Sequence, residues 1–384
     1  MKTKRACACL GIVVVLLTGA VLFGCGSSSG LRLLPRLIAL DDNSSADSVN
    51  VFNINATSGV LTAVGPAFDL GAITGGTSLD DPAAIAVHPN RHWAYVYDWN
   101  NGNIEAFFLD VNGRPIIIGT VIPEGYPFDL HSLAITPDGK FLFAVDGDTY
   151  VDVYQINQTT GALTSLGYFD LTNGNANGCS AAVTATNTRL YIGDRPIGAC
   201  AGNDAVWVWD ISSAGAVTYR NTMYLAAPSG PGVLQVDPNG RAIYMGDWDS
   251  EWLGAVSLGA DGTPDGTVNR VVVPAGAETW NNQIVLSREN PATNLYITTG
   301  TGVHGFSIAS NSDLTELGSS PYADSVVWTS GLAIDLSNSF VYTTDGSRVY
   351  GFNRNAATGE LADFTIGNPA ATTHTSAYAI GAAD

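Results

Sequence analysis

The chain has 384 residues, a net charge of −19 and 46% hydrophobic residues, which is enough apolar material for one large domain. Its acidity excludes functions that depend on binding nucleic-acid backbones or anionic lipid headgroups, because both need a basic surface. No linker rich in proline and serine and no run of like charges divides the sequence.

Residues 1–24 have the pattern of an export signal. A basic start precedes the apolar run 10–23, which is too short to span a bilayer comfortably, and Cys25 follows directly after Gly24. This arrangement resembles a bacterial lipoprotein signal peptide, after which the cysteine becomes the lipidated first residue. An ordinary cleaved signal peptide and an uncleaved anchor helix are the alternatives. The basic residues are Lys2, Lys4 and Arg5.

The lipoprotein resemblance implies a location in the bacterial cell envelope. Residues 25–35 would carry lipid on Cys25 and form a flexible tether, since residues 26–30 are only glycine and serine. Gly26 beside the lipidated cysteine resembles outer-membrane sorting. We therefore expect a monomeric outer-membrane lipoprotein that faces the periplasm or the surface and touches the membrane only through its anchor. From Cys25 onward the net charge would be −22, from 13 basic and 35 acidic residues.

An aromatic-rich motif, ending in most copies with an acid, occurs seven times at spacings of 46 to 57 residues. This period fits one four-stranded blade of a β-propeller. The sequence therefore predicts an all-β, seven-bladed β-propeller over residues 36–384, with four antiparallel strands in each blade. The copies are LIALD (37–41), AYVYD (94–98), LFAVD (142–146), LYIGD (190–194), AIYMGD (242–247), LYITT (295–299) and VYTTD (341–345).

A short segment rich in small residues stands before each later copy and predicts the innermost strand of a blade, where small side chains relieve crowding near the axis. The first copy lacks this segment, and the last segment has no copy after it. We therefore expect the C-terminal strand to complete blade 1 and close the ring. The alternative is an open solenoid, which would need polar capping repeats at both ends. The segments are 84–87, 132–135, 180–183, 233–236, 283–286, 331–334 and 377–380.

The third strand of a blade shows period-2 alternation, as in residues 151–157, and a hairpin signal follows it. In these predicted turns an Asn or Asp precedes a glycine that tolerates a left-handed backbone. The pairs are Asn55 with Gly59, Asp110 with Gly113, Asn157 with Gly161, Asp210 with Gly215 and Asn355 with Gly359.

Residues 130–167, LHSLAITPDGKFLFAVDGDTYVDVYQINQTTGALTSLG, resemble a repeat of the seven-bladed lactonase family, whose members include 6-phosphogluconolactonase-like propellers. The Pro-Asp-Gly-Lys and Thr-Gly-Ala-Leu-Thr turns carry this resemblance, and a looser one links the chain to YVTN-type surface propellers. The resemblance extends over nearly the whole exported chain and implies hydrolysis of a lactone. One propeller architecture supports many functions, so activity depends on the site residues.

Of four family elements, one matches. His131 matches the histidine that enters the innermost strand of the third blade, and it would act with Asp146 or Asp194 as a base. The other three elements differ. Where the family has Pro-Arg-His, Asn-Glu and Asn-Arg-Gly, this chain has Asn177-Gly178-Cys179, Asp194-Arg195 and Asp247-Trp248-Asp249. Opening a lactone needs a base and stabilisation of the developing oxyanion, so the missing arginines leave that stabilisation without an evident source.

Other candidates for function precede innermost strands, or for Cys200 follow a second strand, and should gather on one face of the ring. Trp280, Trp328 and His374 are candidate ligand-binding residues, with a purely structural plug at the channel mouth as the alternative for the tryptophans. Cys179 and Cys200 are the cysteines left after the anchor, and an exported pair predicts a disulfide, against the alternative of two free thiols.

The acids that end the second strands recur in nearly every blade. We expect them to bind backbone amides of the following turn, although they could also attract a cation, and Asp146-Gly147-Asp148 and Asp247-Trp248-Asp249 have oxygen ligands suited to calcium. No spacing typical of a transition-metal site occurs, so we expect no metal centre of that kind. His88 is predicted in a turn on the opposite face and His304 at an outward position, both without a role. The recurrent acids are Asp41, Asp98, Asp146, Asp194, Asp247 and Asp345.

Three functions remain open. The sequence favours an envelope-anchored propeller that binds a small molecule or a protein partner on the face carrying His131. The alternatives are a hydrolase of a neutral lactone, because an anionic substrate would meet a repulsive field, and an envelope scaffold or adhesion module.

Overall fold

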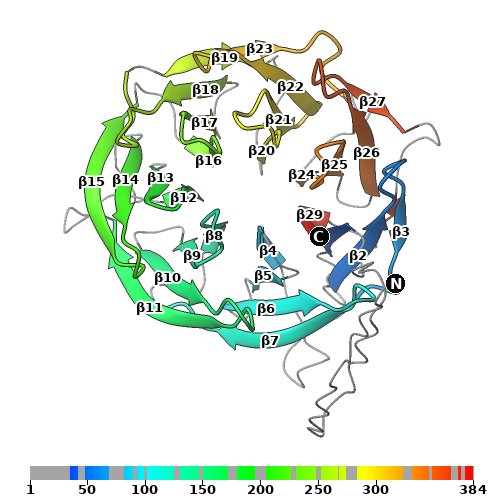
Figure 1. The fold of residues 1–384 in the computed structure, drawn as a ribbon, viewed down its shortest axis with the longest axis horizontal. Helices are drawn as coiled ribbons and strands as arrows, with labels where there is room; N and C mark the ends of the chain where they lie inside the picture. Colours follow the sequence, from blue (N-terminus) through cyan, green and yellow to red (C-terminus); the bar gives the residue numbers. More distant parts are fainter. Residues whose placement is uncertain are drawn as a thin grey trace, which may run out of the picture. The chain divides into compact units, whose positions relative to one another are not determined.

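Seven antiparallel sheets are arranged in a ring around a central axis, one for each repeat of the sequence (Figure 1). The computed structural model describes residues 35–41, 48–68, 82–89, 93–98, 102–124, 130–146, 150–171, 180–194, 205–225, 231–247, 252–266, 268–273, 283–322, 331–345, 348–364, 371–372 and 377–383. The predicted all-β, seven-bladed β-propeller is confirmed. Six sheets have four strands, and one has a fifth, the short β28 (Ala371–Thr372).

The four strands of each blade follow one another from the axis of the ring to its rim. The innermost strands are β29 (Ala377–Ala383), β4 (Pro82–Val87), β8 (Leu130–Ile135), β12 (Ser180–Ala185), β16 (Pro231–Val236), β20 (Ile284–Leu286) and β24 (Leu332–Ile334). The second strands are β1 (Arg36–Asp41), β5 (Trp93–Asp98), β9 (Phe141–Asp146), β13 (Arg189–Asp194), β17 (Ala242–Asp247), β21 (Asn294–Thr299) and β25 (Phe340–Thr344). The third strands are β2 (Ser48–Ile54), β6 (Asn103–Leu109), β10 (Tyr150–Ile156), β14 (Ala205–Ile211), β18 (Trp252–Ser257), β22 (Gly302–Ile308) and β26 (Arg348–Arg354).

The outermost strands form the rim of the ring. They are β3 (Leu61–Ala63), β7 (Pro115–Val121), β11 (Leu163–Asp170), β15 (Val217–Tyr224), β19 (Asn269–Val272), β23 (Leu314–Glu316) and β27 (Leu361–Asp363).

The C-terminal strand closes the ring. β29 pairs with β1 in antiparallel register, from Arg36 opposite Ala383 to Asp41 opposite Ala377, so blade 1 has the order β29-β1-β2-β3. In Figure 1, β29 lies at the centre beside β1, between the innermost strands β24 and β4. The predicted closure is confirmed, and the open solenoid is wrong.

The apolar core lies between blades rather than at the centre of the ring. Successive side chains of a strand point to opposite faces, so Leu37 enters the cluster shared with blade 7 while Ile38 enters the cluster shared with blade 2. Seven such clusters are present among the described residues, one at each junction between neighbouring blades. This explains why the middle positions of the second strands are largely apolar, since both of their faces are covered.

A recurrent hydrogen bond ties the blades together. A tyrosine in the second strand of one blade donates to a backbone carbonyl in the outer turn, between the third and fourth strands, of the next blade. We call these contacts inter-blade tyrosine bonds. They join Tyr95 to Gly161 at 2.9 Å, Tyr191 to Gly262 at 2.8 Å, Tyr296 to Gly359 at 2.6 Å and Tyr342 to Gly59 at 2.7 Å.

The accepting turns need a residue without a side chain. Gly161 has a φ of +76°, and a Cβ built on it would lie 2.6 Å from the indole of Trp93. The predicted turns at Asn55 and Asn157 are confirmed, since each side chain accepts two backbone N–H groups. The prediction for Asp210 is wrong, because β14 continues through it and Ser212 caps that turn instead.

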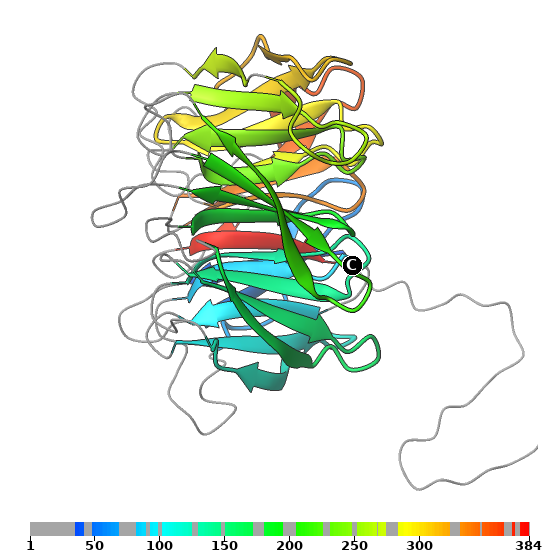
Figure 2. The same ribbon diagram turned by 90° about the vertical axis from the view of Figure 1, so that its left-hand side faces the viewer.

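The strands cross the ring from one face to the other, which Figure 2 shows edge-on. We call the face where the innermost strands begin the top face, and the face where they end the turn face. The second strands run the opposite way, so their last residues return to the top face.

Candidate functional site

A β-bulge recurs at the top face in five consecutive blades, blades 1 to 5. In blade 3, Leu130 pairs with Asp146 and Ser132 with Val145, so His131 is an extra residue on the innermost strand. A bulge bends its strand and re-aims a side chain, and bulges are frequent beside active sites. In blade 1, Tyr378 and Ala379 lie opposite Leu40. The extra residues of blades 2 to 5 are Ala83, His131, Ala181 and Gly232.

Blade 3 therefore has a histidine where its neighbours have alanine or glycine. The bulge also places His131 next to the pair formed by Leu130 and Asp146, so the two predicted catalytic residues are close neighbours in one sheet. Asp194 has the equivalent position in the next blade, opposite Ser180. The backbones of all three lie at the top face, while their side chains lie outside the described part of the structure.

The chain that leads into His131 is held in place by blade 3 itself. The backbone N–H of Glu124 donates to the carboxylate of Asp152 at 2.7 Å, and the hydroxyl of Ser165 donates to the carboxylate of Glu124 at 2.6 Å. Asp152 is buried in β10. These bonds fix the path of the chain six residues before the innermost strand begins.

The remaining predicted site residues, Cys25, Cys179, Cys200, Trp280, Trp328 and His374, lie outside the described residues. Two segments that follow the tryptophans are described. Gln283 donates its N–H to Thr298 at 2.9 Å and accepts from Leu332 at 2.8 Å, while Gly331 donates to Thr344 at 3.1 Å. Both segments enter their innermost strands at the top face.

One recurrent acid shows the predicted scaffolding contact. Asp345 accepts hydrogen bonds from the backbone N–H of Arg348 and from the hydroxyl of Tyr350, each at 2.8 Å. The scaffold interpretation is confirmed for Asp345. Asp98 is buried at the end of β5. Within the ranges described, no group of three or more His, Cys, Asp or Glu side chains could hold a metal ion.

His304 is buried, so its predicted outward position is wrong. Its Nδ1 lies 2.7 Å from a carboxylate oxygen of Glu316, and its Nε2 lies 3.2 Å from the hydroxyl of Thr301. Alternation along β22 gives two faces, and both face a neighbouring blade. His88 follows β4 on the turn face as predicted, is buried, and lies 3.0 Å from the carbonyl oxygen of Gly139.

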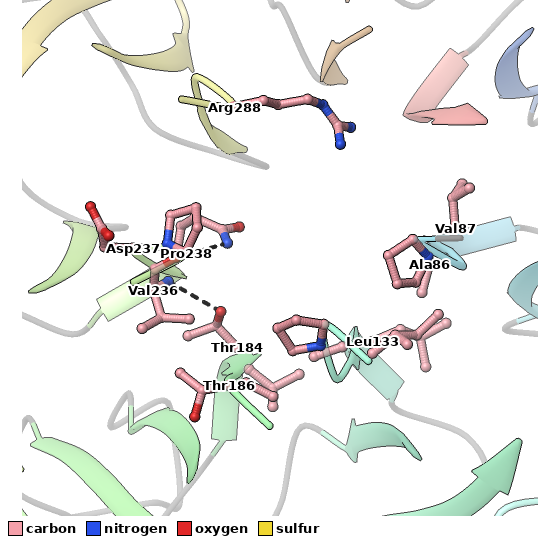
Figure 3. Close-up of a pocket in the computed structure, with 16 residues that line it drawn as sticks. Ala86, Val87, Leu133, Thr184, Thr186, Val236, Asp237, Pro238 and Arg288 are labelled. Carbon is pink, nitrogen blue, oxygen red and sulfur yellow. Dashed lines mark hydrogen bonds between the residues drawn. The ribbon is translucent and has the colours of Figure 1, made fainter. Parts of the chain in front are cut away.

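A cavity of about 430 Å³ occupies the channel at the turn face, opposite the predicted site (Figure 3). The last residues of β4, β8, β12 and β16 form its wall, which is mostly apolar. The sequence analysis missed it. The signal was present, because the second residue after the innermost strand is proline in three blades, Pro89, Pro137 and Pro238, but is Arg288 in blade 6.

No helix in the described part of the chain is long and apolar enough to cross a membrane.

The fold is that of a seven-bladed β-propeller. Residues 36–192 match the model of the family described as "Lactonase, 7-bladed beta-propeller", from β1 into the second strand of blade 4. The resemblance that the sequence predicted is thereby confirmed.

Solved structures with the same fold come from several bacteria. Proteins of Bacteroides uniformis and Bacteroides fragilis, each described as a "putative 6-phosphogluconolactonase", have TM-scores of 0.70 and identities of 16% and 17%, and cover 91% and 93% of this chain and 99% of their own. A periplasmic gluconolactonase of Pseudomonas aeruginosa has a TM-score of 0.64 and 15% identity over 90% of this chain and 97% of its own. At these identities the likeness shows the fold alone. No curated protein matches the sequence.

Proposed function

We propose that the protein is an exported hydrolase of a neutral lactone, acting at the top face of the propeller. The observation that carries this proposal is the bulge of β8, where His131 stands beside Asp146 and the equivalent blades have Ala83, Ala181 and Gly232. Among the bulges of blades 2 to 5, His131 is the extra residue whose side chain can accept and donate a proton, which supports a function added to the repeated scaffold.

The chemistry needs a base at this position. His131 would take a proton from water as that water attacks the lactone carbonyl, and Asp146 or Asp194 would favour the protonated imidazole. The bond between the carbonyl carbon and the ring oxygen then breaks, and the ring oxygen takes up a proton. The product is a hydroxy acid.

A neutral substrate fits the charge of the protein. The net charge is −19, and an acid ends the second strand both in the blade of His131 and in the next blade. A phosphorylated lactone would be repelled by this field. The Pseudomonas aeruginosa structure is described as a periplasmic gluconolactonase, and gluconolactone is such a neutral substrate.

A second candidate is binding of a ligand or protein partner at the same face without turnover. It is favoured by the departures from the family pattern at residues 177–179, 194–195 and 247–249, which remove the cations expected to stabilise an oxyanion. The sequence alone favoured this candidate. We put hydrolysis first because the bulge brings His131 beside Asp146 and because residues 36–192 are similar to the lactonase family.

The proposal includes location. A lipid on Cys25 would hold the propeller at the bacterial outer membrane, as a monomer on the tether of residues 25–35. Scaffolding or adhesion in the envelope is the remaining alternative, and it predicts a stable protein neighbour in crosslinking experiments on intact cells.

A lactonase assay tests the proposal. The full-length chain, purified in lipid nanodiscs, is given glucono-δ-lactone and its 6-phosphate, and acid release is measured above the uncatalysed rate. We expect turnover of the neutral lactone and a loss of about 100-fold or more in kcat/KM for His131→Ala. Asp146→Asn should also be impaired. Gln155→Ala, on the exposed side of the same blade, is the matched control and should keep full activity.

Two results would reject hydrolysis at this site. Full activity of His131→Ala would place the chemistry elsewhere. Saturable binding of the lactone without turnover, abolished by His131→Ala, would establish the binding candidate instead.

A further inference from the structure

Blade 6 has the copy of the aromatic motif that does not end in an acid. Residues 295–299 read LYITT, so Thr299 stands where the other copies have aspartate. In blade 7 the aspartate at this place, Asp345, accepts a hydrogen bond from the hydroxyl of Tyr350. His304 has the place of Tyr350 in blade 6, since each lies opposite the third residue of its motif copy. An imidazole therefore replaces a phenol exactly where the recurrent acid is missing.

His304 is fully buried in β22, and both of its ring nitrogens have oxygen partners. Its Nδ1 lies 2.7 Å from Oε1 of Glu316 on β23, and the same oxygen accepts a hydrogen bond from the hydroxyl of Ser320 at 2.8 Å. Because a carboxylate only accepts hydrogen bonds, Nδ1 of His304 carries the proton in this pair. In the neutral imidazole Nε2 is then an acceptor, and the hydroxyl of Thr301 donates to it at 3.2 Å.

The order of hydroxyl, imidazole and carboxylate is that of a nucleophile, its base and the group that orients the base. Thr301 is half-buried in the short turn between β21 and β22 at the top face, whereas His304 is fully buried. A molecule can therefore approach Thr301 from solvent while the imidazole behind it is closed. Blade 6 is not a neighbour of blade 3 in the ring, so this group is separate from His131.

We propose that Thr301 is a covalent acceptor of acyl groups from activated esters, with His304 as its base. The hydroxyl oxygen of Thr301 forms a bond to the acyl carbon while its proton passes to Nε2 of His304. The bond between the acyl carbon and the leaving oxygen then breaks, and the leaving group takes this proton. The products are an O-acyl threonine and a free alcohol or phenol.

The surroundings of Thr301 define the acyl donor. The backbone N–H of Thr301 already donates to the hydroxyl of Thr299 at 3.1 Å, so this group is not available to stabilise a developing oxyanion. The ester must therefore have a good leaving group. The net charge of −19 favours a neutral donor over an anionic one.

The burial of His304 defines the fate of the product. Water cannot take the place of the threonine hydroxyl at Nε2, because His304 has no exposed surface. Attack of water on the acyl threonine then has no base to assist it. The acyl group should therefore remain on the protein, which makes Thr301 a modification site rather than a centre of turnover.

Acetylation by 4-nitrophenyl acetate tests this site. The full-length chain in lipid nanodiscs is mixed with the ester, release of 4-nitrophenol is followed, and the acetylated residue is identified by mass spectrometry of peptides. We expect a burst of about one equivalent and an acetyl group on Thr301. Thr315, an exposed threonine on β23 of the same blade, is the internal control and should be acetylated at least about 100-fold more slowly.

Variants separate the roles of the three side chains. Thr301→Ser should keep the burst, and Thr301→Val, which has nearly the same shape, should remove it. His304→Gln should slow acetylation of Thr301 at least about 100-fold, and Glu316→Gln at least about tenfold. Thermal melts of each variant show whether it is folded. His131→Ala should be acetylated on Thr301 like the unaltered chain, which separates this inference from the proposed function.

Three results would each overturn the inference. The first is acetylation of Thr315 as fast as that of Thr301. The second is a full burst in Thr301→Val. The third is an unchanged rate at Thr301 in folded His304→Gln, or in folded Glu316→Gln if the histidine variant does not fold.

Discussion

Tyr342 donates a hydrogen bond to the carbonyl oxygen of Gly59 at 2.7 Å, although the two residues are 283 positions apart in the sequence. The bond crosses the junction between the last and first blades and has the same form as the bond of Tyr95 to Gly161 inside the ring. The junction between blades 7 and 1 therefore has the same inter-blade tyrosine bond as the junctions inside the ring.

Tyr342→Phe should destabilise the protein by about 1–3 kcal/mol, because it leaves the Gly59 carbonyl without this donor in a buried place. Tyr95→Phe should cost a similar amount. Urea denaturation measures both, and Tyr219→Phe, whose hydroxyl is on the exposed rim, is the control with an expected cost below about 0.5 kcal/mol. A neutral Tyr342→Phe beside a costly Tyr95→Phe would show that the closing junction contributes little to stability.

Gly161→Ala should be markedly more destabilising than Gly167→Ala. Both glycines have positive φ, but a Cβ at Gly161 meets Trp93 at 2.6 Å, whereas nothing lies within 4 Å at Gly167. We expect about 1 kcal/mol at Gly167 from backbone strain alone and at least about twice that at Gly161. Gly119→Ala, with neither strain nor contact, should be close to neutral in the same melts. Equal losses of stability for Gly161→Ala and Gly167→Ala would show that the side chain of Trp93 can shift to make room for the added methyl group at little cost.

The protein should lose stability in alkali. Burial raises the pKa of Tyr191 and of Tyr296 to about 12, above the ordinary value of 10. The unfolded chain then loses these protons first, so their contribution is complete below pH 10 and is lost as the pH rises through about 12, at most about 1.4 kcal/mol per pH unit for each tyrosine.

Tyr296→Phe should make the pH dependence of unfolding shallower between pH 10 and 12. Tyr224→Phe, at an exposed tyrosine, should leave that slope unchanged. Unfolding free energies in urea at several pH values measure it, and an unchanged slope in Tyr296→Phe would contradict the pKa shift.

Cys25→Ala should release the protein from membranes. If Cys25 carries the lipid anchor, the variant should move from the membrane fraction to the soluble fraction or remain unprocessed, and mass spectrometry of the native chain should find acyl groups on this residue. Cys179→Ser should stay in the membrane fraction. Retention of Cys25→Ala in membranes would favour the uncleaved anchor helix.

Cys179 and Cys200 should be protected from alkylation until the protein is reduced. A disulfide closing this loop would contribute roughly 3 kcal/mol, and Cys179→Ser, Cys200→Ser and the double variant should lose the same amount, because all three remove one bond. Labelling of both thiols without reductant would instead show two free cysteines.

The sequence was sufficient to predict the seven-bladed ring because the strands of each blade have a recognisable pattern within each repeat. The motif at 94–98 and the small residues at 84–87 each appear where the structure has β5 and β4. The closure by 377–380 followed from one missing segment and one surplus segment. Burial was harder to predict, as His304 shows: in a propeller both faces of a third strand are covered, so alternation does not identify an exposed side.

The site was predictable only in its backbone. His131 and Asp146 were expected on one face from their places in the repeat, and the register brings them together. The bulge could not be read from the sequence, because an extra residue in a strand has no spacing signal of its own. The sequence analysis did not single out Arg288, because a charged residue is common in an exposed turn between two strands. Its position at the cavity becomes apparent only from the structure.

The pairing of β29 with β1 also sets the order in which the protein can fold. Blades 2 to 7 are continuous in sequence and can form as the chain emerges, whereas blade 1 needs residues 36–63 and 377–383 together. Until that late contact forms, the edge of β1 is an open template for strands of other chains. The first blade should therefore need protection from strands of other chains until the whole chain is made, and the slowest step in folding should be the pairing of its last strand.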